Sequence, residues 1–198
     1  GINAYYTELN TAKMLHDLNI SCKIDEKKIS RRMDKLGKHS GYELDELQKE
    51  AVVTAAGHGL LVLTGGPGTG KTTTINAMID YFDSEGLEVR LAAPTGRAAK
   101  RMQEATGCEA QTIHRMLEIS GAADEEEGPK QFERNEENPL EADVIIVDEM
   151  SMVDIEIFAS LMQALRLGSK LIMVGDPDQL PSVGPGNVLG DLIASGAM

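Results

Sequence analysis

Tryptophan, long apolar runs and an abundance of cysteine are all missing from this 198-residue sequence. No apolar stretch approaches the roughly 18 residues that a membrane-spanning helix needs, so we expect no membrane partner. Two cysteines, Cys22 and Cys108, stand far apart and in no metal-ligand spacing. They favour reduced thiols in a cytoplasmic protein over a disulfide or metal framework.

Positive charge is also scarce, because 19 Lys and Arg face 32 Asp and Glu for a net charge of −13. This balance argues against a broad basic surface that grips nucleic acid. The acidity is uneven, however. Residues 118–143 contain ten acidic and two basic residues, whereas residues 1–43 contain eight basic and six acidic ones. A nucleic-acid groove outside the acidic stretch is therefore compatible with the composition.

The length and the 41% hydrophobic content fit one α/β domain with a sizeable core. Four short apolar runs are typical of strands buried on both faces, at 60–64, 87–93, 144–147 and 171–174. Helical spacing of apolar residues follows three of them, at 71–83, 96–105 and 154–167. This alternation predicts a three-layer α/β fold with a parallel sheet over about residues 44–194.

Two segments stand outside the alternation. Residues 1–43 are predicted to be helical, to end in a linker near 37–41, and to present an apolar face to a neighbouring domain. Because the chain begins Gly1-Ile2-Asn3, we expect it to be a fragment of a longer protein. Residues 118–142 are predicted as a solvated acidic loop or, around 131–134, as one strand of a small hairpin.

The first predicted strand runs directly into a glycine-rich segment, GGPGTGKTTT. Residues 65–72 fit the pattern G-x-x-x-x-G-K-[ST], with a strand before it and a helix after it. Glycines let backbone N–H groups converge on a phosphate, and the start of the helix adds its positive end. Lys71 supplies a charge for the β- and γ-phosphates, and Thr72 supplies a hydroxyl ligand for Mg²⁺. The segment predicts a P-loop nucleoside triphosphate site made of Gly66, Pro67, Gly68, Thr69, Gly70, Lys71, Thr72 and Thr73.

The third predicted strand ends in Asp148-Glu149, at the edge where parallel sheets bind ligands. Asp148 is predicted to hold Mg²⁺ through water, and Glu149 to orient and deprotonate the attacking water. The alternative is an acid pair that caps a helix over 151–161. The presence of a P-loop in the same sequence favours the catalytic interpretation of this acid pair over the capping one.

The fourth predicted strand is followed by GDPDQLP, residues 175–181. An amide at this edge can hydrogen-bond to a γ-phosphate oxygen or to the lytic water, so Gln179 is predicted to sense the third phosphate. Pro177 and Pro181 stiffen the loop. A plain turn after a strand is the alternative, because Asp, Pro and Gly are common turn residues.

These blocks resemble the superfamily 1 DNA helicases, and specifically the RecD-like helicases and exodeoxyribonuclease V alpha subunits. The resemblance covers about residues 44–196 and is carried by GGPGTGKTTT, APTGRAAKRM, TIHRML, VIIVDEMSM and GDPDQLPSVGPGNVLGDLIASG. It implies a first RecA-like ATPase domain of a 5′-to-3′ DNA helicase that acts in recombination and repair. The implied cofactors are ATP and Mg²⁺, and Gln179 would couple the γ-phosphate to the DNA groove.

The resemblance assigns Gln48 to reading the adenine base, with a solvent-facing helix residue as the alternative. Pro94, Thr95 and Gly96 match a motif that touches single-stranded DNA. A hydroxyl and N–H groups at a helix start can bind a phosphate without a basic patch. This motif therefore reconciles an acidic chain with a DNA partner.

A second strand-contacting motif is matched by Thr112 and His114, although a lone histidine is often structural. Arg97, Lys100 and Arg101 follow the first motif on the same predicted helix. They are either DNA contacts or ordinary surface charges.

The resemblance places a hairpin that splits the duplex at the acidic insert, 118–142. It also implies a second RecA-like domain, absent here, that supplies half of the DNA groove and an arginine for the transferring phosphoryl group. We therefore expect this chain alone to bind ATP–Mg²⁺ weakly and to hydrolyse and unwind little. The expected partners are single-stranded DNA or a duplex junction, that second domain, and subunits of a nuclease–helicase complex. The alternative function is an ATP-gated nucleic-acid-binding switch that does not translocate.

Overall fold

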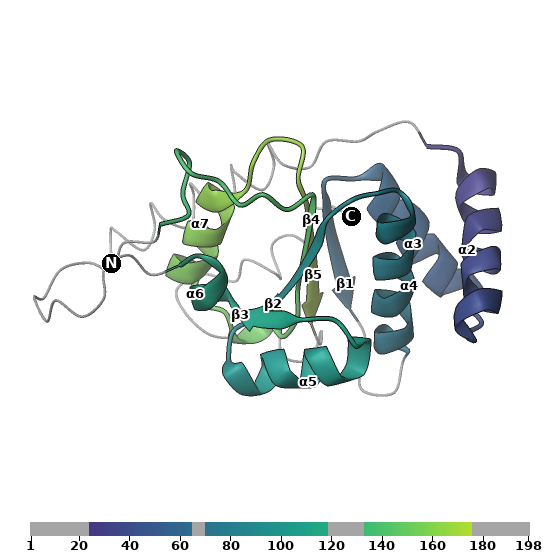
Figure 1. Ribbon diagram of the computed structural model, residues 1–198, viewed down its shortest axis with the longest axis horizontal. Helices are drawn as coiled ribbons and strands as arrows, with labels where there is room; N and C mark the ends of the chain where they lie inside the picture. The colour runs from purple at the N-terminus through teal and green to yellow at the C-terminus, as the bar shows by residue number, and fades with distance from the viewer. Residues whose placement is uncertain (1–23, 65–69, 119–132, 176–198) are drawn as a thin grey trace, which may run out of the picture.

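The computed structural model describes residues 24–64, 70–118 and 133–175, which form a five-stranded sheet between two layers of helices (Figure 1). The strands are β1 (Leu60–Thr64), β2 (Val89–Ala93), β3 (Ala110–Thr112), β4 (Val144–Val147) and β5 (Lys170–Gly175). The helices are α2 (Glu26–Ser40), α3 (Glu46–Gly57), α4 (Lys71–Ser84), α5 (Gly96–Thr106), α6 (Ile113–Met116), the 3-10 helix η1 (Met150–Met152) and α7 (Ile155–Ala164). The predicted three-layer α/β fold is confirmed.

The sheet has the order β1-β5-β4-β2-β3, and every neighbouring pair is parallel. The chain crosses the sheet from β1 through β2 to β3 with α4 and α5 on one face. It returns through β4 to β5 with α6 and α7 on the other face. Parallel crossovers are right-handed, so a reversal of direction across the sheet moves the helices to the opposite face.

The core lies on both faces of the sheet because strand side chains alternate between them. On β4, Ile145 and Val147 pack with α6 and α7, whereas Val144 and Ile146 pack with α4. All four are completely buried, and each stabilises the fold by about 1.5–3 kcal/mol relative to an exposed side chain. The continuous apolar run of this strand is therefore explained by helices on both sides.

The sequence analysis missed one strand of the described residues, and several predicted ends differ from those in the structure. β3 has three residues and lies at the edge of the sheet beside β2, which leaves too short a pattern to detect. The strand predicted at 87–93 begins at Val89, and the helix predicted at 154–167 ends at Ala164. The strands predicted at 60–64 and 144–147 are confirmed at both ends.

The linker predicted near 37–41 is wrong, because these residues form the last turn of α2 and its cap. Gly41 ends the helix in the left-handed conformation, with φ of 81°. A Cβ at Gly37 would lie 2.7 Å from the carbonyl oxygen of Tyr42, so close packing explains this glycine. Ile29 and Met33 of α2 are buried in the same apolar cluster as α3 and α4. A separate domain over residues 1–43 stays a prediction, and residues 1–23 lie outside the described residues.

The acidic insert leaves and rejoins the domain at one point. The Glu133 N–H donates to the carbonyl of Glu118 (2.7 Å), and the Arg134 N–H donates to the carbonyl of Leu117 (3.1 Å). The Arg134 guanidinium also bonds the Glu118 carboxylate at 2.8 Å. The insert was predicted to reach residue 142, but Leu140 is buried in the core. The loop and wedge predictions cover 118–142 and the hairpin-strand prediction covers 131–134. The described part, from 133 on, forms no strand before β4, whereas residues 119–132 lie outside the described residues.

Among the helices of the described residues, none combines the length and the apolar content that crossing a membrane requires.

Candidate functional site

Every strand of a parallel sheet ends at the same carboxyl edge, and most of the predicted site segments follow the ends of these strands in the sequence. Along the order β1-β5-β4-β2-β3, the phosphate loop follows β1, GDPDQ follows β5, and Asp148-Glu149 follows β4. Pro94-Thr95-Gly96 follows β2, and Thr112 ends β3. The fold therefore brings the ends of five strands, at positions 64, 93, 112, 147 and 175 of the sequence, into one row along this edge.

The junction of β1 and β5 is where the connections change face, since β1 leads into α4 on one face and α7 leads into β5 on the other. Open α/β sheets bind ligands at such switch points. Thr64 and Gly175 are paired in register, so the two strands end side by side. Gly66, Pro67, Gly68, Thr69 and Gln179 follow these ends but lie outside the described residues, and their roles stay predictions.

Helix α4 begins at this junction, after Gly70 in the left-handed conformation (φ of 78°). No described side chain caps its first turn, so its first N–H groups can bind an anion. Lys71 and Thr73 are half-buried, and Thr72 is exposed. Lys71 forms no ion pair with any residue that the structure describes. A cation and a hydroxyl therefore stand together at the positive end of a helix.

Gln48 links α3 to the end of the phosphate loop. Its Oε1 accepts the N–H of Asp45 (2.9 Å) in a capping box, and its Nε2 donates to the Gly70 carbonyl (3.1 Å). The same carbonyl accepts the backbone N–H and the hydroxyl of Thr74, each at 3.1 Å. The alternative that Gln48 is a solvent-facing helix residue is therefore wrong. Because the amide keeps one N–H and one lone pair, adenine recognition is chemically compatible with this brace.

Asp148 and Glu149 extend beyond the end of β4, in the middle of the row. The Asp148 N–H donates to the carbonyl of Ala92, and Asp148 Oδ1 accepts the N–H of Glu149 at 2.8 Å. Glu149 is left-handed, with φ of 56°, a conformation that costs a non-glycine residue about 1–3 kcal/mol. Asp154, and not this pair, caps α7 by accepting the Ile157 N–H. The helix-capping alternative is therefore wrong.

Glu149 has one ion-pair partner that the sequence did not reveal. The guanidinium of Arg101, on α5, lies 3.6 Å from Glu149 Oε1. The Arg101 side chain is 63% exposed and that of Glu149 is 31% exposed. Forty-eight positions separate the two residues in the sequence, so only the pairing of β4 with β2 brings them together.

The two predicted DNA-contact motifs lie next to each other. Ala93 of β2 pairs with Thr112 of β3, so Thr95 and Thr112 follow adjacent strand ends. Thr95 caps α5 by accepting the Ala98 N–H (3.1 Å), and Thr112 caps α6 by accepting the Arg115 N–H (3.2 Å). Thr95, Gly96 and Arg97 are exposed, whereas Thr112, Pro94 and His114 are half-buried.

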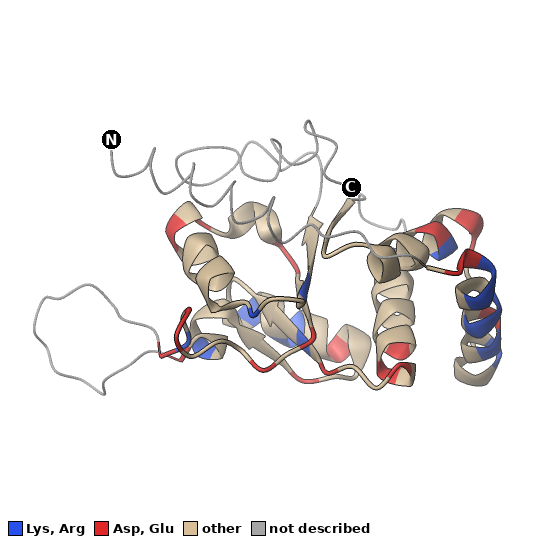
Figure 2. Ribbon diagram, turned by 90° about the horizontal axis from the view of Figure 1, so that it is seen from above, with Lys and Arg blue, Asp and Glu red and all other residues tan. Residues whose placement is uncertain are grey.

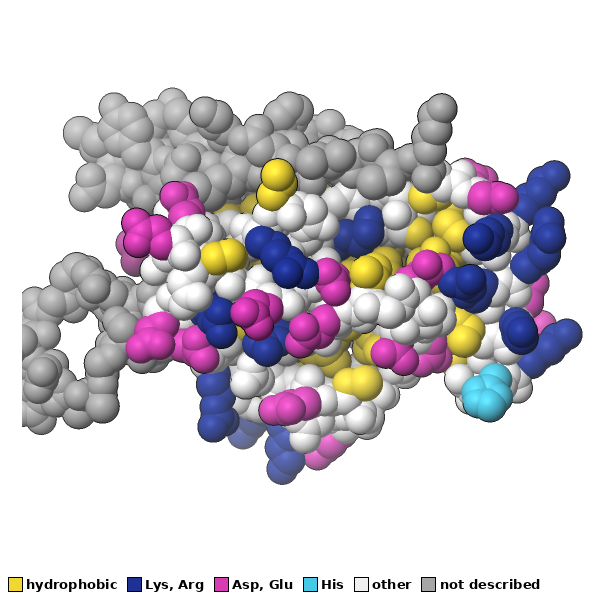
Figure 3. Space-filling model, turned by 45° about the horizontal axis from the view of Figure 1, so that its top comes forward, with side chains coloured by type: hydrophobic (Ala, Val, Ile, Leu, Met, Phe, Trp, Pro, Cys, Tyr) yellow, Lys and Arg dark blue, Asp and Glu magenta, His cyan; other side chains and the backbone are white. Residues whose placement is uncertain are grey.

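The positive charge of the described residues gathers elsewhere. Figures 2 and 3 show its densest cluster on α2, which packs against α3 and α4, with other Lys and Arg side chains scattered over the rest of the described residues. The cations of this helix are Lys27, Lys28, Arg31, Arg32, Lys35 and Lys38. They stand at the β1 side of the sheet, whereas the predicted DNA motifs follow β2 and β3. A phosphate at those motifs would be bound by hydroxyls and N–H groups together with a few cations of α5.

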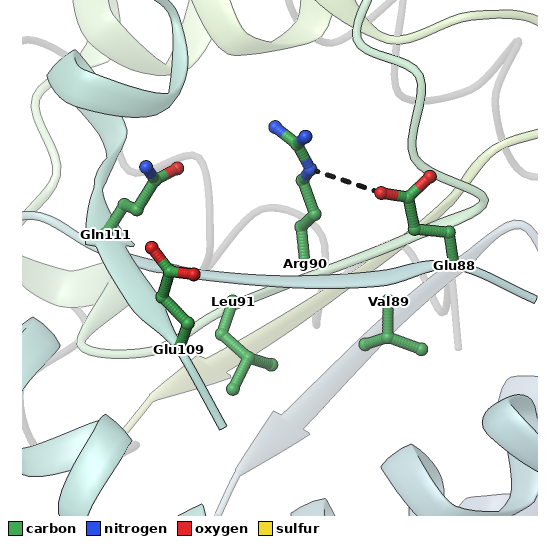
Figure 4. A pocket seen from close by; sticks show the side chains of 6 residues that line it. All are labelled: Glu88, Val89, Arg90, Leu91, Glu109 and Gln111. Atoms are coloured by element: carbon green, nitrogen blue, oxygen red, sulfur yellow. Dashed lines mark ion pairs between the residues drawn. The ribbon is translucent and has the colours of Figure 1, made fainter. Parts of the chain in front are cut away.

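A hollow of about 290 Å³ lies at the opposite, amino edge of the sheet (Figure 4). Its polar walls come from Arg90 and Gln111, with Glu88 and Glu109 at the starts of β2 and β3. Arg90 pairs with Glu88 at 3.7 Å. The hollow contains none of the predicted site residues and lies away from the phosphate loop.

The family model described as "AAA domain" matches residues 48–185. The ATP-dependent RecD2 DNA helicase of Deinococcus radiodurans is 47% identical over 143 residues, which are 72% of this chain and 19% of that protein. The RecBCD enzyme subunit RecD of Mycolicibacterium smegmatis is 40% identical over an alignment of 176 residues, and the match covers 75% of this chain and 30% of that protein. This chain therefore spans less than a third of the length of either relative.

Among solved structures, a Pif1 helicase from Bacteroides in complex with ADP-AlF3 and single-stranded DNA matches with a TM-score of 0.50 and 25% identity. The match covers 78% of this chain and 37% of that one. A structure of two coordinating Pif1 helicases at forked duplex DNA matches with a TM-score of 0.52 and 25% identity, over 77% and 38% of the two chains. Helicase motors thus share this sheet and its flanking helices.

Proposed function

Because this chain belongs to the AAA-domain family and is a RecD-like segment of superfamily 1 helicases, we propose that it is the ATP-binding half of a DNA helicase motor. The observation that carries this proposal is the row of segments at the carboxyl edge of the sheet. Its β1 and β5 side has the chemistry of a triphosphate site, and its β2 and β3 side has that of a phosphodiester site. Asp148 and Glu149 stand between the two.

The triphosphate of ATP would lie over the first turn of α4. The backbone N–H groups there and the Lys71 ammonium would neutralise the β- and γ-phosphates. Gln48, held between Asp45 and Gly70, would face the adenine while it keeps the end of the loop in place. Gly66, Pro67, Gly68 and Thr69 would complete the cradle.

The residues present also fit Mg²⁺. Thr72 offers an exposed hydroxyl oxygen and Asp148 a carboxylate, both hard oxygen donors that suit this ion. The described residues contain no cluster of three or more His, Cys, Asp and Glu that could enclose a metal. Magnesium usually keeps several water ligands and also binds phosphate oxygens of the substrate, so two ligands from the protein are enough. Bound there, the ion would neutralise charge on the phosphates.

Glu149 would orient and deprotonate the attacking water, and Gln179 would report whether the γ-phosphate is present. The left-handed backbone at Glu149 is consistent with a reactive role, because strain of this kind gathers at functional sites. Single-stranded DNA would be held by Pro94, Thr95, Gly96 and Arg97, with Thr112 and His114 beside them.

The complete protein would need more than this chain. A second RecA-like domain would supply an arginine worth about 10³–10⁵ in rate and the other half of the DNA groove. The insert at 118–142 would be the wedge at the duplex junction. A cytoplasmic role in recombination and repair, 5′-to-3′ polarity and membership of a nuclease complex are parts of the same proposal.

The test compares hydrolysis and unwinding by the complete protein on duplexes with 5′ or 3′ tails. Wild type should hydrolyse ATP faster with DNA and unwind the 5′-tailed duplex. Glu149→Gln should lose at least about 10²-fold in DNA-stimulated kcat while it still binds ATP. Glu156→Gln, the same change at an exposed position on α7, is the matched control.

Retention of DNA-stimulated hydrolysis by Glu149→Gln would contradict the assignment of that residue. Nucleotide-dependent DNA binding without unwinding by wild type would instead favour the ATP-gated switch. The isolated 198-residue chain should bind ATP–Mg²⁺ weakly and hydrolyse it negligibly, so robust DNA-stimulated turnover by this chain would contradict the need for a second domain.

A further inference from the structure

The ion pair between Arg101 and Glu149 joins the two sides of the carboxyl edge. From it we infer that Arg101 is a positioning residue that holds the Glu149 carboxylate away from the nucleotide until DNA is bound. The inference rests on the proposed function, because it takes Glu149 as the group that activates water. It adds a route by which DNA changes the rate of hydrolysis.

The backbone of Glu149 leaves only its side chain free to move. Its N–H is bonded to Asp148 Oδ1, and its carbonyl accepts the N–H of Met152 in η1 at 3.0 Å. The left-handed φ of 56° is fixed by these bonds on either side. The position of the carboxylate is therefore decided by rotation about side-chain bonds, which a single ionic contact can bias.

The pairing draws that carboxylate in one direction. β4 lies in the middle of the sheet, with β5 and β1 on one side and β2 and β3 on the other. Arg101 belongs to α5, which contacts β2 and β3. The guanidinium thus holds Glu149 toward the proposed DNA side of the row, whereas β1, which leads into the proposed phosphate loop, lies on the opposite side of β4.

The ion pair between Arg101 and Glu149 is also weak enough for a competing anion to break. At 3.6 Å, with the Arg101 side chain 63% exposed, it is a loose surface ion pair that changes an equilibrium by only about two- to five-fold. Arg101 lies on the helix that opens with Thr95 and Gly96, the proposed phosphate contacts. A DNA phosphate at this helix would attract the exposed guanidinium and leave Glu149 to rotate toward the water.

Because both DNA and nucleotide would act on the ion pair between Arg101 and Glu149, their binding is thermodynamically linked. If DNA favours release of Glu149, a bound nucleotide that draws Glu149 away from Arg101 must strengthen DNA binding by the same factor. The rate of ATP hydrolysis would thereby be lower in the absence of DNA, and the affinity for DNA would be higher when ATP is bound.

The experiment measures steady-state ATP hydrolysis by the complete protein, without DNA and with saturating single-stranded DNA. Arg101→Gln should raise kcat without DNA by about two- to five-fold and leave KM for ATP unchanged. At saturating DNA its kcat should match wild type, so the stimulation by DNA becomes smaller. Arg101→Lys, which keeps a cation, should restore most of the low rate without DNA.

Lys35→Gln is the control for the loss of one positive charge, because Lys35 is exposed on α2 and forms no ion pair with any described residue. It should leave the rate without DNA unchanged. An unchanged or lower rate without DNA in Arg101→Gln would overturn the inference, as would an equal rise in Lys35→Gln. Glu149→Gln separates the two levels of the proposal. If it still hydrolyses ATP, the role of Glu149 fails; if it is inactive and Arg101→Gln behaves as wild type, only the role of Arg101 fails.

Discussion

The two edges of the same sheet use charged residues in opposite ways. At the amino edge, Lys170 donates to the carbonyls of Ala56 (3.1 Å) and His58 (2.9 Å). Asp143 there accepts the N–H of Glu88 and pairs with Arg166. At the carboxyl edge, Lys71 has no ion-pair partner among the described residues, and Glu149 has one that is loose and exposed.

The difference separates structural from functional polarity. Backbone carbonyls at the end of α3 need donors, and the Lys170 ammonium supplies them, so Lys170 and Asp143 are both engaged in bonds that hold the fold together. The carboxyl edge instead combines a helix start without a described side-chain cap, a left-handed acid and an exposed hydroxyl. We therefore expect substitutions at the carboxyl edge to change activity and those at the amino edge to change stability.

The largest expected effect is that of Lys71→Ala at the carboxyl edge. Loss of the only side-chain charge at the start of α4 should lower ATP hydrolysis by the complete protein at least about 10²–10³-fold. The free energy of unfolding should change by no more than about 0.5 kcal/mol, because Lys71 forms no ion pair with a described residue. Hydrolysis assays and urea unfolding measure the two quantities, and a large loss of stability would break the comparison.

The second prediction concerns Gly70→Ala. A Cβ there would meet Gln48 Nε2 at 2.5 Å, and the φ of 78° costs an L-residue about 1–2 kcal/mol. We expect at least about a tenfold weaker affinity for ATP, measured by titration. Gly86→Ala is the control, since Gly86 has a φ of 77° but no atom within 4 Å of the added Cβ. Equal weakening in both variants would show that strain alone is responsible.

The third prediction moves to the amino edge. Lys170→Met keeps most of the apolar stem but leaves the carbonyls of Ala56 and His58 without their ammonium donor. The free energy of unfolding should fall by about 1–3 kcal/mol, as measured by urea denaturation. Hydrolysis of ATP at saturating substrate should stay within about twofold of wild type. A selective loss of activity would mean that this edge also serves the site.

The smallest effect, and the one that depends on pH, is expected at Asp143. The N–H of Glu88, followed by the Arg166 guanidinium, holds the pKa of this carboxyl below its ordinary value of 3.8. Its stabilising effect is therefore present above that value and is lost as the pH falls through the lower pKa of the folded state. Asp143→Asn should be less stable than wild type at neutral pH by under about 1 kcal/mol. Thermal unfolding from pH 7 to pH 3 should show this gap closing.

Much of the fold followed from short patterns. The strands at 60–64 and 144–147 were predicted at both ends, because apolar runs of four or five residues with helical stretches between them admit few arrangements. β3 was missed, because three half-buried residues carry no period. The linker near 37–41 was wrong, because Gly37 serves close packing against Tyr42, which no local pattern reveals.

The candidate site was predicted in its parts but not in its contacts. Lys71, Thr72, Asp148 and Glu149 were predicted as site residues because their chemistry is local to a strand end followed by a turn, and the structure places them at the start of α4 and directly after β4. The hydrogen bond from Gln48 to Gly70 and the ion pair of Arg101 with Glu149 cross 22 and 48 positions of the sequence, respectively. Such contacts depend on strand order, which the sequence does not state.

The sequence by itself determined which candidate catalytic and phosphate-binding groups this protein contains, because the phosphate-loop pattern and the acid pair each consist of consecutive residues. Only the tertiary structure decided how these groups meet. By placing β5 between β1 and β4, and β2 on the far side of β4, it put Glu149 within reach of a guanidinium from the helix after β2. The physical reason is that parallel strands end at a common edge, while their order follows from the packing of helices on both faces of the sheet.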